Sequence, residues 1–132
     1  MTNDEIISQL GDIAGIKHLA FDLQRVCNLT INSDYHITLA ELDEDNLIVH
    51  GVICQLAPEV AANASLTLLS ANMMFATVNG PYVSWSAENT ALYLTLPLQR
   101  ETLDAHALYE QIHYLIQNIE HLRETLHQQS II

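Results

Sequence analysis

The sequence predicts a single α+β domain over residues 1–132, in the order helix, three-stranded antiparallel meander, helix, two strands, helix. Three observations lead to this prediction. Residues 3–15 and 102–127 carry apolar side chains at helical spacing. Several segments rich in Ile, Val, Leu and Thr are separated by short polar loops, as in antiparallel hairpins. A further helical run, residues 58–77, is apolar on nearly every side.

The first half of the chain is expected to form one helix and the meander. Thr2 and Glu5 have the spacing of a capping box, and Gly15 permits the left-handed conformation that ends many helices. Apolar and polar residues then alternate along three segments, which predicts a sheet with one face packed inward and the other mostly polar. The three strands are expected at residues 26–32, 35–41 and 47–56.

The second half is expected to contain a helix, two strands and the last helix. Pro58 suits the first turn of a helix that should run to about Thr77, and strands follow at residues 82–86 and 91–96. After Pro97, the last helix carries apolar residues in alternating steps of four and three, which is typical of a narrow stripe packed along a sheet. The stripe consists of Leu108, Ile112, Leu115, Ile119, Leu122 and Leu126.

The helical run from Ala64 to Phe75 has only small Ser, Thr and Asn residues between its apolar positions, so water is a poor neighbour on any of its sides. A large apolar side chain forgoes roughly 1.5–3 kcal/mol when it stays in water instead of being buried. A chain of 132 residues has little interior in which to hide such a helix. The sequence therefore predicts a partner subunit that covers it.

The charge and composition exclude several classes of partner. Four basic residues against 16 acidic ones give a formal net charge of −12, whereas binding to phosphate backbones or anionic lipid needs clustered Lys and Arg. Nucleic acid is therefore excluded as a partner, and no apolar run is long enough to predict a membrane span. Because residues 1–5 lack the basic and then apolar order of a secretory signal, we expect a cytoplasmic protein in which Cys27 and Cys54 stay thiols.

No motif of the sequence predicts catalysis, a cofactor or a metal site. Two Glu-x-x-His pairs in the last helix, Glu110 with His113 and Glu124 with His127, fall mostly beside or opposite its apolar stripe. A solvated polar face is therefore expected there, since a di-metal site needs such pairs turned into a core. No Ser or Cys lies in a recognisable nucleophile motif, and the scattered glycines match no phosphate-binding loop.

Several short stretches occur together in a characteristic order. They are Leu19–Asp22 with Cys27–Ile31, Tyr35–Leu39, Ile48–Val52, Leu69–Met73 through Asn79–Tyr82, and Ala91–Leu98. With the order of the predicted elements, they resemble the class I type III secretion chaperones, the CesT (Tir chaperone) family. The resemblance covers residues 5–127 and rests on this joint occurrence, because no single stretch is diagnostic.

The resemblance implies a homodimeric, ATP-independent chaperone of the bacterial cytoplasm. Such a chaperone binds the N-terminal chaperone-binding segment of one or more secreted effector proteins in extended form and keeps them soluble and competent for secretion. Contact with the secretion ATPase is a further partnership that the resemblance suggests, although no acidic extension follows the last helix in this sequence.

The resemblance also suggests which residues make these contacts. The dimer interface would lie on the second helix and a neighbouring strand, at Leu66, Leu69, Met73, Met74 and Trp85. The effector-binding surface would lie on the first helix and first sheet, where apolar grooves accept side chains and exposed backbone accepts an added strand. Its residues would be Ile6, Leu10, Ile13, Phe21, Leu29, Ile31, Ile37 and Leu39, for each of which plain core packing is the alternative.

Two other functions stay open. A small hotdog-type acyl-thioester hydrolase wraps a long apolar helix in an antiparallel sheet, and residues 58–77 could supply that helix. The predicted strands, however, lie on both sides of this segment in the sequence, and its central part holds no acidic residue to act as base or nucleophile. The second alternative is a metal-binding dimer that uses the Glu-x-x-His pairs.

Overall fold

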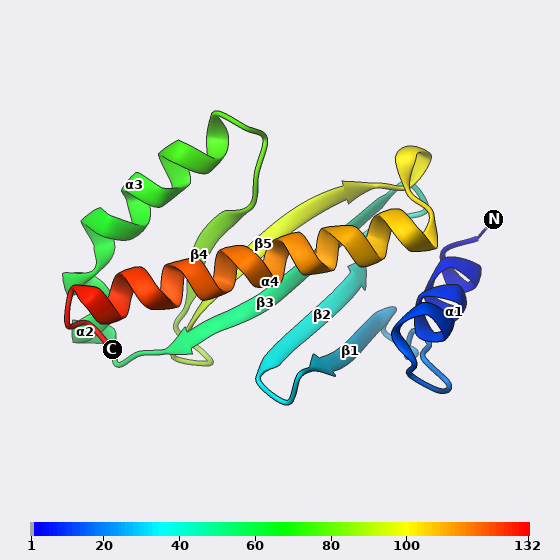
Figure 1. Cartoon of the computed structure of the whole chain (residues 1–132), viewed down its shortest axis with the longest axis horizontal. Helices are drawn as coiled ribbons and strands as arrows, with labels where there is room; N and C mark the ends of the chain where they lie inside the picture. Colours follow the sequence, from blue (N-terminus) through cyan, green and yellow to red (C-terminus); the bar gives the residue numbers. More distant parts are fainter. Residues whose placement is uncertain (1) are drawn as a thin grey trace. The chain divides into compact units, whose positions relative to one another are not determined.

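The computed structural model describes residues 2–132. The helices and strands, drawn in Figure 1, are α1 Asn3–Ala14, β1 Val26–Ile31, β2 Tyr35–Glu41, β3 Asn46–Gln55, α2 Pro58–Asn63, α3 Ser65–Ala76, β4 Tyr82–Ser86, β5 Ala91–Gln99 and α4 Ala105–Gln128, with a 3₁₀ turn at Arg100–Thr102. The strands pair into one sheet in the order β1-β2-β3-β5-β4. The α+β class and the order of the strands along the chain are confirmed, and one predicted helix is divided in two.

The chain divides into two compact units. The first contains the residues up to Val49 together with Pro97–Tyr114, and the second contains His50–Leu96 together with Leu115–Ile132. β3, β5 and α4 each continue from one unit into the other. A single domain over residues 1–132 therefore stays a prediction.

In the first unit, α1 has the ends that its sequence predicts. The Thr2 hydroxyl accepts a hydrogen bond of 3.1 Å from the backbone N–H of Glu5, which satisfies one of the free donors at the start of the helix. The helix stops at Gly15, whose φ of 73° is left-handed and whose N–H reaches the Gly11 carbonyl. Between these caps, Ile6, Ile7 and Leu10 are at most 1% exposed.

The hairpin of β1 and β2 shows the alternation predicted for the meander. Its antiparallel register runs from Val26 opposite Ala40 to Ile31 opposite Tyr35. Asn32 and Ser33 in the turn have φ values of 54° and 59°, the left-handed pair that matches the twist of a tight hairpin. One face of the hairpin is buried through Cys27, Leu29, Tyr35, Ile37 and Leu39.

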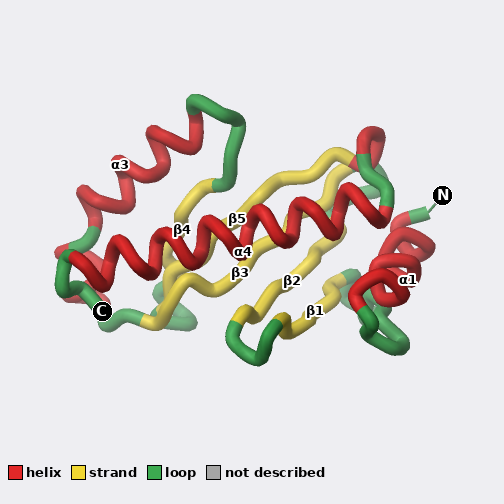
Figure 2. The backbone as a smooth tube through the Cα atoms, in the orientation of Figure 1, coloured by secondary structure: helices red, strands yellow, loops and turns green. Residues whose placement is uncertain are grey.

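In the second unit, the predicted helix over residues 58–77 is two helices, α2 and α3, which Figure 2 draws separately. They meet at Ala64, a fully buried residue whose N–H is shared between the carbonyls of Val60 and Ala61, at 3.2 Å from each. No glycine or proline stands at this junction, so the sequence offers no local signal for the break. Pro58 occupies the first turn of α2, as predicted.

The ends of β5 and α4 also differ from the prediction. β5 continues through Pro97 to Gln99, and its register with β4 ends where Thr95 faces Tyr82. β4 therefore does not extend to Pro97. Because Pro97 has no β4 residue beside it, its lack of a backbone N–H costs no hydrogen bond to that strand. α4 begins at Ala105 because the carboxylate of Asp104 accepts the N–H of Ala107 at 2.8 Å and caps the helix there.

Candidate functional site

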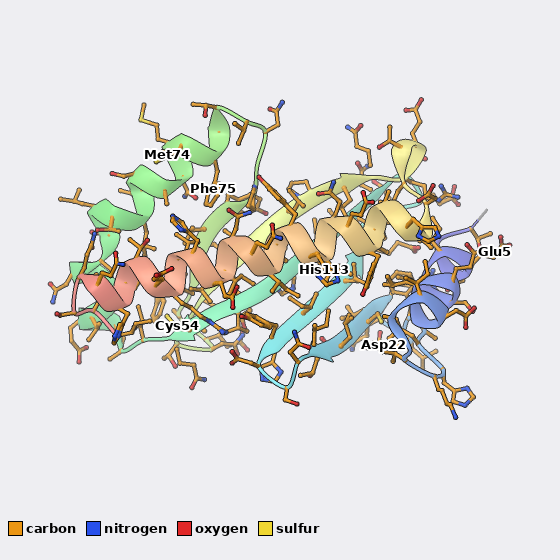
Figure 3. The ribbon with its side chains drawn as sticks, viewed as in Figure 1. Glu5, Asp22, Cys54, Met74, Phe75 and His113 are labelled. Carbon is orange, nitrogen blue, oxygen red and sulfur yellow. The ribbon has the colours of Figure 1, made fainter. Side chains whose placement is uncertain are left out.

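α3 exposes most of its large apolar side chains. Leu68 alone among the residues of this helix is buried, whereas the exposed fractions of Leu66, Leu69, Met73 and Met74 lie between 63% and 79%. Leu69, Met73 and Met74 follow Leu66 by three, seven and eight residues, which places all four side chains on one side of the helix. We call this set the α3 face; Figure 3 labels Met74 on it. All four residues were predicted to lie in the dimer interface.

Two further exposed apolar residues follow α3 closely in the sequence. Val78 just after α3 and Tyr82 at the start of β4 are 65% and 45% exposed. A groove of about 380 Å³ is lined by residues of α2, α3 and β4, among them Leu68, Leu69 and the half-buried Trp85. Neither Val78 nor Tyr82 was predicted to be an interface residue, although both flank the Asn79–Pro81 turn that separates α3 from β4.

Five of the eight residues proposed for effector binding belong to the core. Ile6, Leu10, Leu29, Ile37 and Leu39 are between 0% and 7% exposed. Their burial fits core packing, the alternative that the sequence left open, because each side chain leaves little or no surface for a client to contact. The other three, Ile13, Phe21 and Ile31, retain intermediate exposure.

A fully exposed leucine lies near Phe21 in the loop between α1 and β1. Leu23 is presented on a turn in which the Arg25 N–H donates to the Asp22 carbonyl at 3.0 Å. The carboxylate of Asp22 also accepts the backbone N–H groups of Gln24 and Val26, at 2.9 and 3.0 Å, so the turn is well defined. The exposure of Leu23 depends on this loop conformation, for which the sequence shows no periodic signal.

The outer edge of β1 offers backbone groups to a further strand. β1 stands at one end of the sheet, and the Glu41 N–H donates to the Arg25 carbonyl, so residue 25 faces β2. Because the direction of the N–H and C=O groups alternates along a strand, the backbone groups of Val26, Asn28 and Thr30 face away from β2. The backbone groups of Val26 are already bound by Asp22. The Asp22 carboxylate accepts the Val26 N–H, and the Asp22 N–H donates to the Val26 carbonyl. Asn28 and Thr30 are the remaining edge positions, and both residues are exposed.

Arg25 joins α1 to the hairpin of β1 and β2. Its guanidinium donates two hydrogen bonds to the Glu41 carboxylate, at 3.0 and 2.9 Å, and a third to Asp4 of α1 at 2.9 Å. Asn3 also donates to Glu41, at 2.7 Å. The hydrogen bonds from Arg25 and, to a smaller extent, the one from Asn3 lower the pKa of the Glu41 carboxyl group. The Arg25 guanidinium lies 4.7 Å from the centre of the Phe21 ring, which links this network to one of the partly exposed apolar residues.

The cysteines and histidines are not arranged as a reactive centre in the described chain. Burial raises the pKa of both thiols, Cys27 and Cys54, which disfavours the reactive thiolate. Within residues 2–132, no group of three His, Cys, Asp or Glu side chains is placed to hold a metal ion. His113 is exposed and packs edge-on against the ring of Tyr109, at 4.5 Å between ring centres. Over the same residues, no helix is both long enough and apolar enough to cross a membrane.

Comparisons with known proteins agree with this architecture. The chain is 28% identical over 126 residues to a Tir chaperone of Escherichia coli O157:H7, an alignment that covers 96% of this chain and 80% of the relative. A Tir chaperone of Citrobacter freundii is 26% identical over the same share of each chain.

Solved structures share the fold. A chain of the HopA1-SchA chaperone-effector complex matches with a TM-score of 0.78 at 17% identity, and 91% of each chain is covered. A chain of the ExsC-ExsE complex matches with a TM-score of 0.79 at 14% identity, covering 92% of this chain and 90% of that one.

The hotdog alternative has no support from these relatives, and α3 exposes the apolar residues that a hotdog sheet would enclose. The model of the Tir chaperone protein (CesT) family matches residues 5–123, nearly the whole chain. The chain therefore belongs to the Tir chaperone protein (CesT) family.

Proposed function

We propose that this protein is a type III secretion chaperone that binds the N-terminal segment of one or more effector proteins in extended form and keeps them soluble and competent for secretion. The observation that carries this function is the family match over residues 5–123. Curated relatives are named Tir chaperones, and one structural relative comes from a chaperone-effector complex.

The working form that we propose is a homodimer in which the α3 face of one copy packs against the α3 face of the other. A two-fold interface requires one self-complementary patch, and a helix with exposed leucines and methionines in a single stripe supplies it. The groove beside Leu69 and Trp85 would receive apolar side chains of the second copy. Burying these side chains would contribute roughly 1.5–3 kcal/mol for each one that becomes fully covered.

The effector segment, in this proposal, pairs as an added strand with the outer edge of β1. The outward N–H and C=O groups of Asn28 and Thr30 would form the main-chain hydrogen bonds, which tolerate many client sequences. Ile13, Phe21 and Ile31 retain exposed surface and would contact apolar client side chains, and the fully exposed Leu23 would add a fourth contact.

The chaperone is proposed to act in the bacterial cytoplasm without ATP, cofactor or catalytic step. The exposed apolar side chains of a client favour the bound state because binding removes them from water, so no fuel is needed. Contact with the secretion ATPase is part of the proposal, since delivery of the client requires a docking step at the secretion apparatus.

A proline at the edge of β1 tests the binding mode. Thr30→Pro removes an N–H that faces away from β2, so the strand keeps its pairing with β2 while an added strand loses a hydrogen bond. The client is an effector fragment identified by pull-down from the native host and measured by calorimetry. We expect Thr30→Pro to weaken binding by at least about ten-fold, the effect of losing one well-formed hydrogen bond together with the steric block.

Thr30→Val is the matched control, because it keeps the N–H and should bind as the wild type does. Circular dichroism of both variants establishes that the fold is intact. Unchanged binding by a folded Thr30→Pro variant would refute strand addition at this edge, and failure of wild-type protein to bind any effector segment would refute the chaperone function itself.

A further inference from the structure

β4 is the strand at the other end of the sheet, and its outer edge is already occupied. The backbone N–H of Val83 donates to Oδ1 of Asn72 at 2.6 Å, and Nδ2 of Asn72 donates to the Val83 carbonyl at 3.2 Å. Because a backbone N–H can only donate, the orientation of the Asn72 amide is fixed by this pair. One side chain of α3 thus makes both hydrogen bonds that a neighbouring strand would make to Val83.

The rest of this edge is short. By the alternation of backbone directions, positions 81, 83 and 85 face away from β5. Residue 81 is a proline without an N–H, and the N–H and carbonyl of Val83 are bound to Asn72. Trp85 is the one remaining position of these three, and a single position is too short for an added strand.

Asn72 lies on the side of α3 that meets the sheet. It follows Leu68, the buried residue of this helix, by four positions, so both side chains share one helix face. α3 packs against β4, as Figure 1 also shows. The paired hydrogen bonds of Asn72 and the packing of Leu68 hold this face of α3 in place, and near the start of the helix the Thr67 hydroxyl also donates to the Gln129 side chain at 2.8 Å.

We infer that Asn72 is a positioning residue that stands in for a strand on the outer edge of β4. It closes that edge to strand addition, which leaves the β1 edge to the client, and it fixes the direction in which the α3 face is presented to the second copy. The closure of the β4 edge is a property of the single chain. The roles in client binding at β1 and in dimerisation through the α3 face rest on the proposed function.

The test measures how fast the amide proton of Val83 exchanges with solvent, by NMR. In Asn72→Ala the Val83 N–H loses its acceptor, so its exchange should become at least about ten-fold faster relative to the wild type. In Asn72→Asp the acceptor is kept and the donor is lost, so Val83 should stay more protected than in Asn72→Ala. Ser70→Ala, an exposed change on the same helix, is the matched control and should leave the Val83 amide unchanged.

Leu94, which lies opposite Val83 on β5, reports whether the sheet itself is intact in each variant. Each comparison is also made in the Met73→Glu background, in which the proposed dimer is disrupted. Unchanged Val83 exchange in Asn72→Ala would overturn the inference, as would equal protection in Asn72→Ala and Asn72→Asp.

The dimer has a separate readout. We expect Asn72→Ala to weaken dimerisation by about ten-fold, because a helix that rotates presents its apolar face poorly. An unchanged dimer would overturn the positioning role. A wild-type protein that is monomeric would refute the proposed dimer while the Val83 result still decides whether Asn72 closes the edge.

Discussion

α1 and α3 have the same length, 12 residues, and treat their apolar side chains in opposite ways. In α1 the large apolar residues Ile6, Ile7 and Leu10 are almost completely buried, whereas in α3 four of them are more than 60% exposed. α1 carries Asp, Glu and Gln on its exposed positions, and α3 carries no charged residue at all. The buried apolar residues of α1 therefore belong to the core of the subunit, whereas those of the α3 face are available to another molecule.

The two helices also differ in how they are held. α1 has a Thr cap, a glycine stop and an ion pair with Arg25. α3 has no side-chain cap at its N-terminus and no left-handed residue at its C-cap, and it is held by Leu68, by Asn72 and by a hydrogen bond from Thr67 to Gln129. The structure of α1 is therefore specified mainly by its own sequence, whereas the position of α3 depends on its contact with β4.

The largest expected effect breaks the subunit at α1. Leu10→Ala should lower the free energy of unfolding by about 2–5 kcal/mol, because it leaves a cavity at a fully buried site. Leu66→Ala on the exposed side of α3 should change it by no more than about 0.5 kcal/mol. Urea denaturation in the Met73→Glu background measures both without a contribution from dimerisation. Equal losses for the two variants would contradict the comparison.

The next effect separates the subunits without unfolding them. Met73→Glu or Leu69→Glu places a charge in the proposed interface and should weaken dimerisation by about 100-fold or more, while the circular dichroism spectrum of the subunit stays unchanged. Leu23→Glu is the matched control, since Leu23 is even more exposed but lies outside the α3 face. Sedimentation equilibrium checks all three, and dissociation by Leu23→Glu would show that the α3 face is not special.

A smaller effect concerns the stop of α1. Gly15 has a φ of 73° and nothing within 4 Å of the place where a Cβ would stand, so Gly15→Ala is penalised by conformation and not by contact. Thermal or urea denaturation should reveal a loss of about 1 kcal/mol. Gly15→Asn should lose less, because asparagine tolerates the left-handed conformation. The reverse order would exclude the backbone as the cause.

The smallest effect is electrostatic and also anchors α1. The pKa of Glu41 is lower in the folded chain than its ordinary value of 4.5, so its charged form stabilises the fold above that pH. This contribution should disappear as the pH falls below 4.5 and Glu41 takes up a proton in the folded state. Glu41→Gln should therefore flatten the pH dependence of the urea midpoint between about pH 6 and pH 3. An unchanged profile would indicate that other carboxylates cause the acid sensitivity.

The sequence was sufficient where local chemistry decides the structure. The ends of α1 follow from Thr2 and Gly15, and the apolar run of α3 predicted a helix with more apolar surface than a single subunit covers. The break at Ala64 was not predictable, because it involves neither glycine nor proline. Continuation of β5 past Pro97 depends on how far β4 extends along it, which no local pattern reveals.

The assignment of site residues was limited by a different ambiguity. An apolar stripe at helical spacing looks the same whether it packs into a core or lines a binding groove, so Ile6 and Leu10 could not be told from contact residues. Leu23 and Asn72 have no periodic signal, because the role of each depends on a turn or on a neighbouring strand. These positions required the three-dimensional arrangement.

The mass of the wild-type protein in solution shows whether a second copy covers the α3 face. Sedimentation equilibrium at micromolar concentration should give about twice the chain mass of 14.8 kDa, with the Met73→Glu variant returning to the mass of one chain. A wild-type mass of 14.8 kDa under the same conditions would contradict the account, since the exposed leucines and methionines of α3 would then have no second copy to cover them.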